Sequence, residues 1–396
     1  MRVLLNTILI EIWIGLISQK ENERCRKSCM EKSAVIFPYD ISNISLILHK
    51  NLLNYNITHI VSPISWGYCF KDAGYDLGID TSYKVECELE KTINEVDAII
   101  FLDSRLSFNE FELFLYAIKF VEKNKDIVML CEMNESYKDI LKRAAKHYES
   151  QYFDTWENEI KQFDYSEYTL LDPPVPVIGI IGTAKGTGKF ETLLMIKESI
   201  EKKGYSVLCI SSKLYGRFLN VESYPDFMFD SSYEIENKIV SFNYFVNQLY
   251  RLRKSDIILI EVPGGIFPLT KRIHENFSFQ NYLVSNAINF DLCILDLHFE
   301  QLTIEYLNWL RETTKQKYNY ELAGFIMSNN MLNWNAMSLS GSSSCITISE
   351  GFVEHCIEEF YNNGYNICGL FNKEKISDFT DKLIKVLGEE SSFDCI

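Results

Sequence analysis

The sequence of 396 residues has little proline, no excess of positive charge and no long uninterrupted apolar run. Only eight prolines in a chain that is 47% hydrophobic predict domains rich in regular secondary structure and exclude a disordered or fibrous protein. A formal net charge of −16 argues against a nucleic-acid-binding protein, because binding to phosphate backbones requires a basic surface. We therefore expect a globular protein with no nucleic acid among its partners.

The sequence also lacks the motifs of several common catalytic and metal sites. Its 11 cysteines include no Cys-x-x-Cys pair and its six histidines include no His-x-x-x-His pair, so no dedicated transition-metal site is expected. No Gly-x-Ser-x-Gly motif is present, which argues against a hydrolase with a nucleophile elbow. Several cysteines lie in apolar runs, where a free thiol behaves as a small hydrophobic side chain. This usage predicts a reducing, cytoplasmic location.

The first 29 residues differ from the rest of the chain. Their apolar stretch over 3–18 is interrupted by Asn6 and Glu11, and it is shorter than the roughly 20 residues that a membrane span needs. No Ala-x-Ala-like cleavage site follows it, whereas a regular domain pattern begins at Met30. We interpret 1–29 as an extension from a misassigned start codon, with a weak membrane-surface helix as the alternative, and expect no stable membrane span.

From residue 30 onward, short apolar strands alternate with amphipathic helices, a pattern typical of parallel βαβ units. The expected strands cover 34–38, 57–62, 97–103, 127–132, 177–181, 206–211, 256–261, 291–296 and 322–327, and helices are expected near 45–54, 108–122 and 136–148. Two adjacent prolines at 173–174 indicate a connector. We predict an α/β protein with two doubly wound domains. They are a Rossmann-like domain over 30–150 and, after a linker over 151–175, a P-loop NTPase-like domain over 176–396.

A glycine-rich turn between a strand and a helix forms the clearest candidate site. Residues 182–189 read GTAKGTGK, and the candidate nucleotide-binding residues are Gly182, Thr183, Gly186, Thr187, Gly188 and Lys189. In such a turn, backbone N–H groups, the helix N-terminus and the lysine all face phosphate oxygens. The turn departs from the G-x-x-x-x-G-K-[ST] pattern, because Gly182 comes one residue early and Phe190 replaces the hydroxyl residue that ligates Mg²⁺. Phosphate binding is expected, whereas hydrolysis stays open; Thr192 is the nearest hydroxyl, and the helix should turn it away.

A carboxylate followed by two glycines forms a second candidate site. The strand 256–261 ends at Glu261, and Gly264 and Gly265 follow after two residues. Ligands of doubly wound folds bind at the carboxyl edge of the sheet, where a carboxylate can hold Mg²⁺ and glycines let the backbone approach a phosphate. We therefore predict Glu261 as a metal ligand and both glycines as cofactor-binding residues. Asp296, which ends a later strand, is interpreted as a strand-end residue.

These two motifs resemble dethiobiotin synthetase and its relatives among the P-loop NTPases. The resemblance implies ATP as the cofactor, with GTP as the alternative, together with Mg²⁺ and an ATP-dependent ligase or NTPase activity. It also implies catalytic roles for Lys189, Lys213 and Glu261, since Lys213 in ISSKLYG occupies the place of a family lysine that contacts phosphate or the reacting carboxyl group. Asn329 is similar to the purine-reading asparagine of the family, although it comes one residue late.

Nearly the whole chain from Met30 is similar to the peptide maturation system proteins of clostridial natural-product cassettes. The similarity rests on an N-terminal α/β domain with the motif VSPISWG at 61–67, followed by a divergent Gly-Lys loop. It implies three partners: a small Cys-rich, bacteriocin-like precursor peptide, a radical-SAM maturase and an acyl-carrier-related protein. The resemblance implies a pathway rather than a reaction.

The N-terminal domain carries another candidate binding site. Asp40 and Trp66 each follow an expected strand and Asp103 ends one, so all three share one edge of the sheet. There they would grip a peptide or small ligand or pack against the second domain.

Three functions stay open for the chain as a whole. The first is ATP-dependent modification of a precursor peptide, the second is a nucleotide-gated scaffold that presents the peptide to a maturase, and the third is a purely structural loop. We favour a nucleotide-binding maturation factor.

Overall fold

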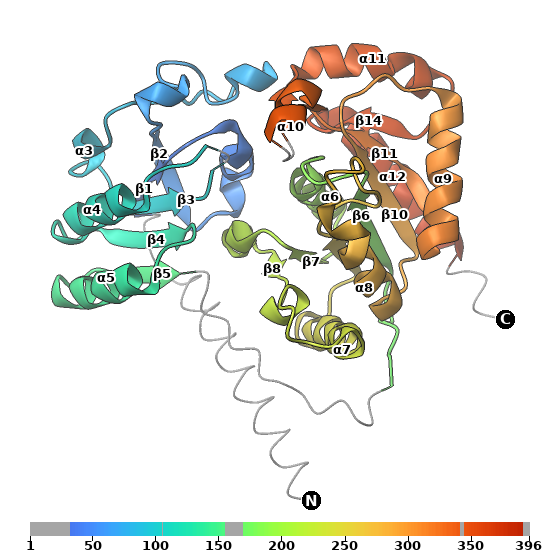
Figure 1. Ribbon diagram of the computed structural model, residues 1–396, viewed down its shortest axis with the longest axis horizontal. Coiled ribbons are helices and arrows are strands. Elements are labelled where there is room, and N and C mark those ends of the chain that lie inside the picture. Colours follow the sequence, from blue (N-terminus) through green and yellow to red (C-terminus); the bar gives the residue numbers. More distant parts are fainter. Residues whose placement is uncertain (1–31, 105, 155–168, 341–343, 391–396) are drawn as a thin grey trace, which may run out of the picture. The chain divides into compact units, whose positions relative to one another are not determined.

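The computed structural model describes residues 32–104, 106–154, 169–340 and 344–390 (Figure 1). The described residues form two compact units. Unit 1 contains the chain up to Asp72 and Tyr83–Asp154, whereas unit 2 contains Ala73–Ser82 and the chain from 169 onward. The extension interpreted at 1–29 lies outside the described residues. Within the described parts of the chain, every helix is too short or too polar to cross a bilayer.

Unit 1 is built on one parallel sheet with the order β2-β1-β3-β4-β5. Its strands are β1 (Lys32–Phe37), β2 (Tyr55–Ile60), β3 (Ala98–Leu102), β4 (Asp126–Leu130) and β5 (Tyr152–Asp154), and its longer helices are α4 (Glu110–Val121) and α5 (Glu135–His147). Strands β3 and β4 are buried along their whole length, as expected for central strands of a parallel sheet. This order is that of a doubly wound fold, with the switch point between β1 and β3.

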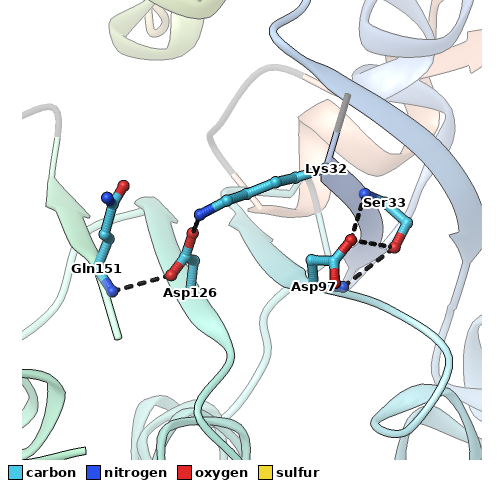
Figure 2. Close-up of polar contacts among 5 residues, drawn as sticks. All are labelled: Lys32, Ser33, Asp97, Asp126 and Gln151. Carbon is cyan, nitrogen blue, oxygen red and sulfur yellow. Dashed lines mark hydrogen bonds and ion pairs between the residues drawn. The ribbon is translucent and has the colours of Figure 1, made fainter. Parts of the chain in front are cut away.

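Polar side chains join the strands at the amino edge of this sheet (Figure 2). Asp97 accepts hydrogen bonds from the backbone N–H of Ser33 at 2.9 Å and from its hydroxyl at 2.8 Å, and these bonds lower the pKa of the carboxyl group. Asp126 pairs with the ammonium group of Lys32 at 2.5 Å and accepts from the backbone N–H of Gln151 at 2.9 Å. Structural ion pairs and hydrogen bonds therefore occupy this edge, while the loops of the opposite edge carry the candidate site.

Unit 2 is built on a parallel sheet with the order β14-β11-β10-β6-β9-β7-β8. Its strands are β6 (Val177–Gly182), β7 (Val207–Ser211), β8 (Glu222–Ser223), β9 (Ile257–Glu261), β10 (Leu292–Leu297), β11 (Leu322–Met327) and β14 (Ile367–Gly369). Helix α6 (Lys189–Lys202) packs on this sheet and against α12 (Lys373–Glu390). Side chains of α7 (Ile235–Arg253), α8 (Phe279–Ala287), α9 (Ile304–Tyr318) and α11 (Glu350–Asn362) form one apolar core with the strands. Strand β6, which leads into the glycine-rich turn, therefore lies at the centre of the sheet.

Several short elements differ from the sequence prediction. The helix expected over 45–54 is broken into α2 (Ile44–Leu48) and a 3₁₀ turn, η2 (Lys50–Leu52). Strand β5 lies in the segment that was expected to be a linker, and β8, β14 and the hairpin of β12 (Asn330–Leu332) with β13 (Cys345–Thr347) were not expected. Each of these strands has at most three residues, which is too few for an apolar period to show in the sequence.

Candidate functional site

The glycine-rich turn connects β6 directly to the first residue of α6. Gly186 and Gly188 both have a φ of 86°, a left-handed conformation that costs other residues free energy. A Cβ atom at Gly182 would lie 2.3 Å from the hydroxyl oxygen of Thr187, which is itself fully buried. The turn is anchored to β10, because the backbone N–H of Thr183 donates to the carbonyl of Asp296 at 3.0 Å. The local sequence thus folds into a tight loop at the N-terminus of a 14-residue helix.

Lys189 is the first residue of α6, and its side chain returns to the loop. It is only 6% exposed. Its ammonium group donates to the carbonyl of Gly264 at 2.7 Å and approaches the carbonyl of Ala184 at 3.4 Å. An ammonium group carries three N–H donors, so one donor is left for a phosphate oxygen at the helix N-terminus.

The two glycines after β9 lie against the glycine-rich turn. A Cβ atom at Gly265 would be 2.3 Å from Cα of Ala184 and 2.7 Å from the carbonyl oxygen of Thr183. In addition, the backbone N–H of Ile266 donates to the carbonyl of Gly182 at 2.9 Å. The structure therefore brings together the two motifs that the sequence singled out separately, through contacts between their backbones.

Glu261 ends β9 next to the end of β7. Its side chain is 4% exposed, and Oε2 accepts hydrogen bonds from the hydroxyl of Ser211 at 2.9 Å and from the backbone N–H and hydroxyl of Ser212 at 2.9 and 3.0 Å. Bonds from three donors fix the orientation of this carboxylate. Sequence reasoning missed both serines, although they directly precede the candidate Lys213.

Phe190, which occupies the place of the usual Mg²⁺-ligating hydroxyl, packs into an aromatic contact. It is 3% exposed, and its ring meets that of Tyr215 edge to face at a centroid distance of 5.3 Å. Lys213 is exposed, and its ammonium group lies 5.6 Å from the centroid of the same tyrosine ring. Phe190 thus provides an apolar contact between α6 and the loop after β7, and no metal ligand.

Thr192 and Asp296 form a buried pair beside the loop. The threonine hydroxyl donates to Oδ2 of Asp296 at 2.8 Å, and both residues are fully buried. Oδ1 of Asp296 has no hydrogen-bond partner among the described residues. Burial raises the pKa of Asp296 well above its ordinary value, although the hydroxyl of Thr192 and the charge of Lys189 act in the opposite direction. The hydroxyl of Thr192 is thus bonded to Asp296, and Asp296 lies fully buried near the end of β10.

Asn329, the candidate for purine recognition, follows β11 and is 2% exposed. Its amide nitrogen donates to the carbonyl of Ile348 at 2.9 Å, so the side chain holds the segment that precedes α11. Glu350 begins α11, and burial raises its pKa to about 7, with Glu354 acting in the same direction and Asn329 in the opposite one. The buried amide of Asn329 therefore lies beside Glu350, a carboxyl group with a pKa of about 7.

We expect Glu350→Gln to stabilise unit 2 at pH 8 by about 2 kcal/mol, a value reduced for the partial exposure of the side chain. Between the ordinary pKa of 4.5 and the raised value of about 7, the folded state binds more protons than the unfolded state. Stability therefore falls as pH rises through this window, and glutamine removes the loss. Urea unfolding at pH 4.5 and pH 8 would measure the change in the free energy of unfolding, with Glu358→Gln on the same helix as the control. A gain of equal size at both pH values would contradict the prediction.

The candidate residues of unit 1 mainly hold their own loops. Asp40 is 1% exposed, and its carboxylate accepts from the backbone N–H of Ser42 at 2.7 Å, which caps a 3₁₀ turn. The backbone carbonyl of Asp103 accepts from the amide of Asn43 at 2.9 Å. Trp66 meets Phe108 edge to face, with centroids 6.2 Å apart. These contacts account for Asp40 and Trp66 by packing and capping, and a ligand-binding role for them stays a prediction.

No known protein family matches the sequence, and no curated protein matches it. Three solved structures that match the chain are the following. A DUF1611 family protein from Anabaena variabilis has a TM-score of 0.57 and 10% identity, covering 89% of this chain and 100% of that one. Cobyrinic acid a,c-diamide synthase from Mycobacterium smegmatis, with bound ADP and magnesium, has a TM-score of 0.26 and 13% identity, covering 39% of this chain and 74% of its own. An apo GTPase from Pyrococcus abyssi has a TM-score of 0.25 and 15% identity, covering 42% of this chain and 70% of its own.

The first of these structures supports the fold class. At 10% identity, the likeness to the DUF1611 protein shows a shared fold of two α/β domains, so the prediction of two doubly wound sheets is confirmed. Unit 2 has a glycine-rich loop between a central strand and a helix that begins with lysine, which is the strand–loop–helix arrangement that the sequence predicts. The resemblance to peptide maturation proteins stays a prediction.

Proposed function

We propose that this chain binds a purine nucleoside triphosphate at the loop 182–189. The observation that carries the proposal is the position of Lys189, which lies at the start of α6 with its ammonium group between the two loops that meet there. Backbone N–H groups at a helix N-terminus and a buried cation together make a phosphate site. Calorimetric titration of the full chain with ATP and with GTP tests the proposal and decides between the two bases. An absence of binding to both would overturn it.

The residues around the loop fit a magnesium ion that is held mainly by the nucleotide. Phe190 supplies no ligand, and the hydroxyl of Thr192 is bonded to Asp296. Among the described residues, no group of three or more metal-binding side chains is found. Mg²⁺ commonly keeps several waters and is held by phosphates with one or two carboxylates. Glu261, oriented by Ser211 and Ser212, is the carboxylate that would hold the ion, which would neutralise phosphate charge.

We expect Glu261→Gln to remove most of the effect of Mg²⁺ on nucleotide affinity. In the parent protein, Mg²⁺ should strengthen ATP binding about tenfold, since one metal–carboxylate contact is worth on the order of a charged hydrogen bond. The amide keeps the volume of the side chain but loses the charge. Titrations with and without EDTA measure the difference, and Glu305→Gln, a distant substitution in the first turn of α9, controls for the lost charge. An unchanged effect of Mg²⁺ in Glu261→Gln would exclude Glu261 as the metal-holding residue.

We further propose that nucleotide binding serves the maturation of a ribosomally made peptide natural product. This step rests on the resemblance of the chain from Met30 to peptide maturation proteins, and it takes the Cys-rich precursor, the radical-SAM maturase and the acyl-carrier-related protein as partners. The buried Phe190 and the Thr192–Asp296 pair favour a nucleotide-gated scaffold over rapid hydrolysis, because the position directly after Lys189 offers no hydroxyl for the metal. ATP-dependent modification of the precursor is the alternative. An assay of phosphate release in the presence of the precursor distinguishes the scaffold from the modifying enzyme. Only the enzyme would release at least one phosphate for each precursor molecule.

A further inference from the structure

A second candidate site lies on unit 2, outside the loop 182–189. We call it the aromatic groove; it has a volume of 590 Å³ and is lined by Phe277, Ser278, Phe279, Tyr282, Lys317 and Tyr318. Ligand sites in proteins typically measure about 300–1,000 Å³. The side chains of Phe277 and Tyr282 are 67% and 50% exposed at its rim. The groove therefore presents large aromatic surfaces to solvent.

The backbone of the groove is strained at Phe277, the most exposed of its aromatic residues. Phe277 and Ser278 are consecutive non-glycine residues with φ of 52° and 64°. Left-handed conformations of this kind cost free energy and cluster at ligand sites, where the surrounding structure maintains them. The ring of Phe277 stacks on His274 at 4.5 Å but is otherwise largely exposed, so burial in a core does not account for the strain.

A buried hydroxyl in the groove has no partner. Ser278 is 3% exposed, and its Oγ forms no hydrogen bond with any described residue. Buried hydroxyl groups are almost always hydrogen-bonded in folded proteins. Ser278 lines the groove, so its unpartnered hydroxyl is a second observation, independent of the backbone strain, that points to an occupant.

One of the residues that line the groove is charged, Lys317. The ammonium group of Lys317 donates to the carbonyl of Ile266 at 2.9 Å, lies 5.0 Å from the ring of Tyr318, and pairs with no carboxylate among the described residues. Exposed Lys271 and Arg272 lie on the segment that leads to the groove, and this segment carries one acidic residue, Glu275. In a chain with a net charge of −16, such a cluster favours an acidic partner.

The aromatic surface continues beyond the groove. Lys317 also lies 5.6 Å from the ring of Phe267, which stacks on Trp309 at 5.2 Å, and Trp309 stacks on Tyr306 at 5.8 Å. Trp309 is 49% exposed. Phe267 and Tyr306 are partly buried against the core, so Trp309 is the exposed ring of this row. Exposed aromatic surface with flanking charge is typical of protein-binding sites. This strip extends past the groove and therefore suits an extended peptide better than one small molecule.

We infer that the aromatic groove binds an acidic peptide segment, with a large apolar side chain in the groove and an adjacent carboxylate paired with Lys317. The inference goes beyond nucleotide binding and does not depend on it. The groove is nevertheless joined to the loop after β9, because Lys317 and Tyr318 both donate to the carbonyl of Ile266, and Asn281 of α8 donates to that of Gly265.

Fluorescence anisotropy with the full chain tests the inference. The probe is a fluorescein-labelled peptide of six alternating aspartate and phenylalanine residues, and a matched probe has asparagine in place of aspartate. We expect the acidic probe to bind at least fivefold more tightly than the matched probe. Lys317→Gln should weaken the acidic probe about fivefold and leave the matched probe unchanged, whereas Lys315→Gln on the same helix should change neither. Tyr282→Ala should weaken both probes about tenfold, and Phe352→Ala, which removes a similarly exposed ring on α11, should not.

The strain at Phe277 gives a second readout. Phe277→Asn should lower probe affinity about tenfold while leaving the thermal midpoint unchanged or higher, because asparagine tolerates the left-handed conformation. No binding of the acidic probe, or equal affinity in the parent and Lys317→Gln, would overturn the inference. It would also be overturned if a single-stranded oligonucleotide bound in preference to the peptide, or if sedimentation showed that a second copy of the chain covers the groove. Nucleotide titrations are independent of these results, so failure of one proposal is distinguishable from failure of the other.

Discussion

Replacing Lys189 with alanine should lower the affinity for ATP or GTP about 100-fold, since a charged hydrogen bond to phosphate is worth up to about 3 kcal/mol. The ammonium group is the buried cation that approaches the carbonyls of both Ala184 and Gly264. Alanine removes the charge and leaves the backbone groups of the loop in place. Calorimetric titration of both nucleotides into the parent and the variant measures the change.

Two further variants distinguish loss of the site from loss of the fold. Lys202→Ala removes an exposed charge from the last turn of the same helix and should change affinity by less than about twofold, because exposed charges at this distance are screened. Lys189→Gln keeps N–H donors for the carbonyls of Ala184 and Gly264 but removes the charge. If Lys189→Gln keeps the parent's thermal midpoint and still loses affinity, charge is the cause. Parent-like affinity in Lys189→Ala would refute the phosphate site.

The parts of the site that the sequence predicts are those set by local pattern. The apolar run of β6, the glycines at 186 and 188 and the apolar period of α6 are contiguous, so the strand, loop and helix follow directly from neighbouring residues. The carboxyl end of β9 is predictable for the same reason. Its position beside β6 is not visible in the chain, because strand order is decided by packing of the whole sheet.

The partners of the candidate residues escape prediction because they come from distant segments. Ser211 lies 50 residues from Glu261, and Thr192 lies 104 residues from Asp296, yet each pair is hydrogen-bonded. Nothing in either local sequence indicates such a pair. The aromatic groove is a further case, since its left-handed Phe277 is an unusual conformation for a residue with a large side chain. Tertiary contacts that outweigh local preference are found only in the folded chain.

Gly265→Ala should have the second large effect, with a loss of about 3 kcal/mol of stability and a loss of nucleotide binding, because an added Cβ has no room. The new atom would lie 2.3 Å from Cα of Ala184 and 2.7 Å from the carbonyl oxygen of Thr183. Both are backbone atoms, so no flexible side chain can move aside. Either the glycine-rich turn or the loop after β9 must shift, and with it the carbonyl of Gly264 that holds Lys189.

The adjacent glycine provides a matched control. A Cβ at Gly264 would meet no atom within 4 Å, but its φ of 77° is left-handed, so alanine there should cost only the conformational penalty of about 1–2 kcal/mol. Urea unfolding and ATP titration of both variants compare a steric defect with a conformational one. If Gly264→Ala were the more damaging, backbone conformation and not the close approach of the two loops would govern the site. We expect Gly265→Ala to be the more damaging of the two. That result would mean that the close approach of Gly265 to Ala184 holds Lys189 and the end of β9 together as one site.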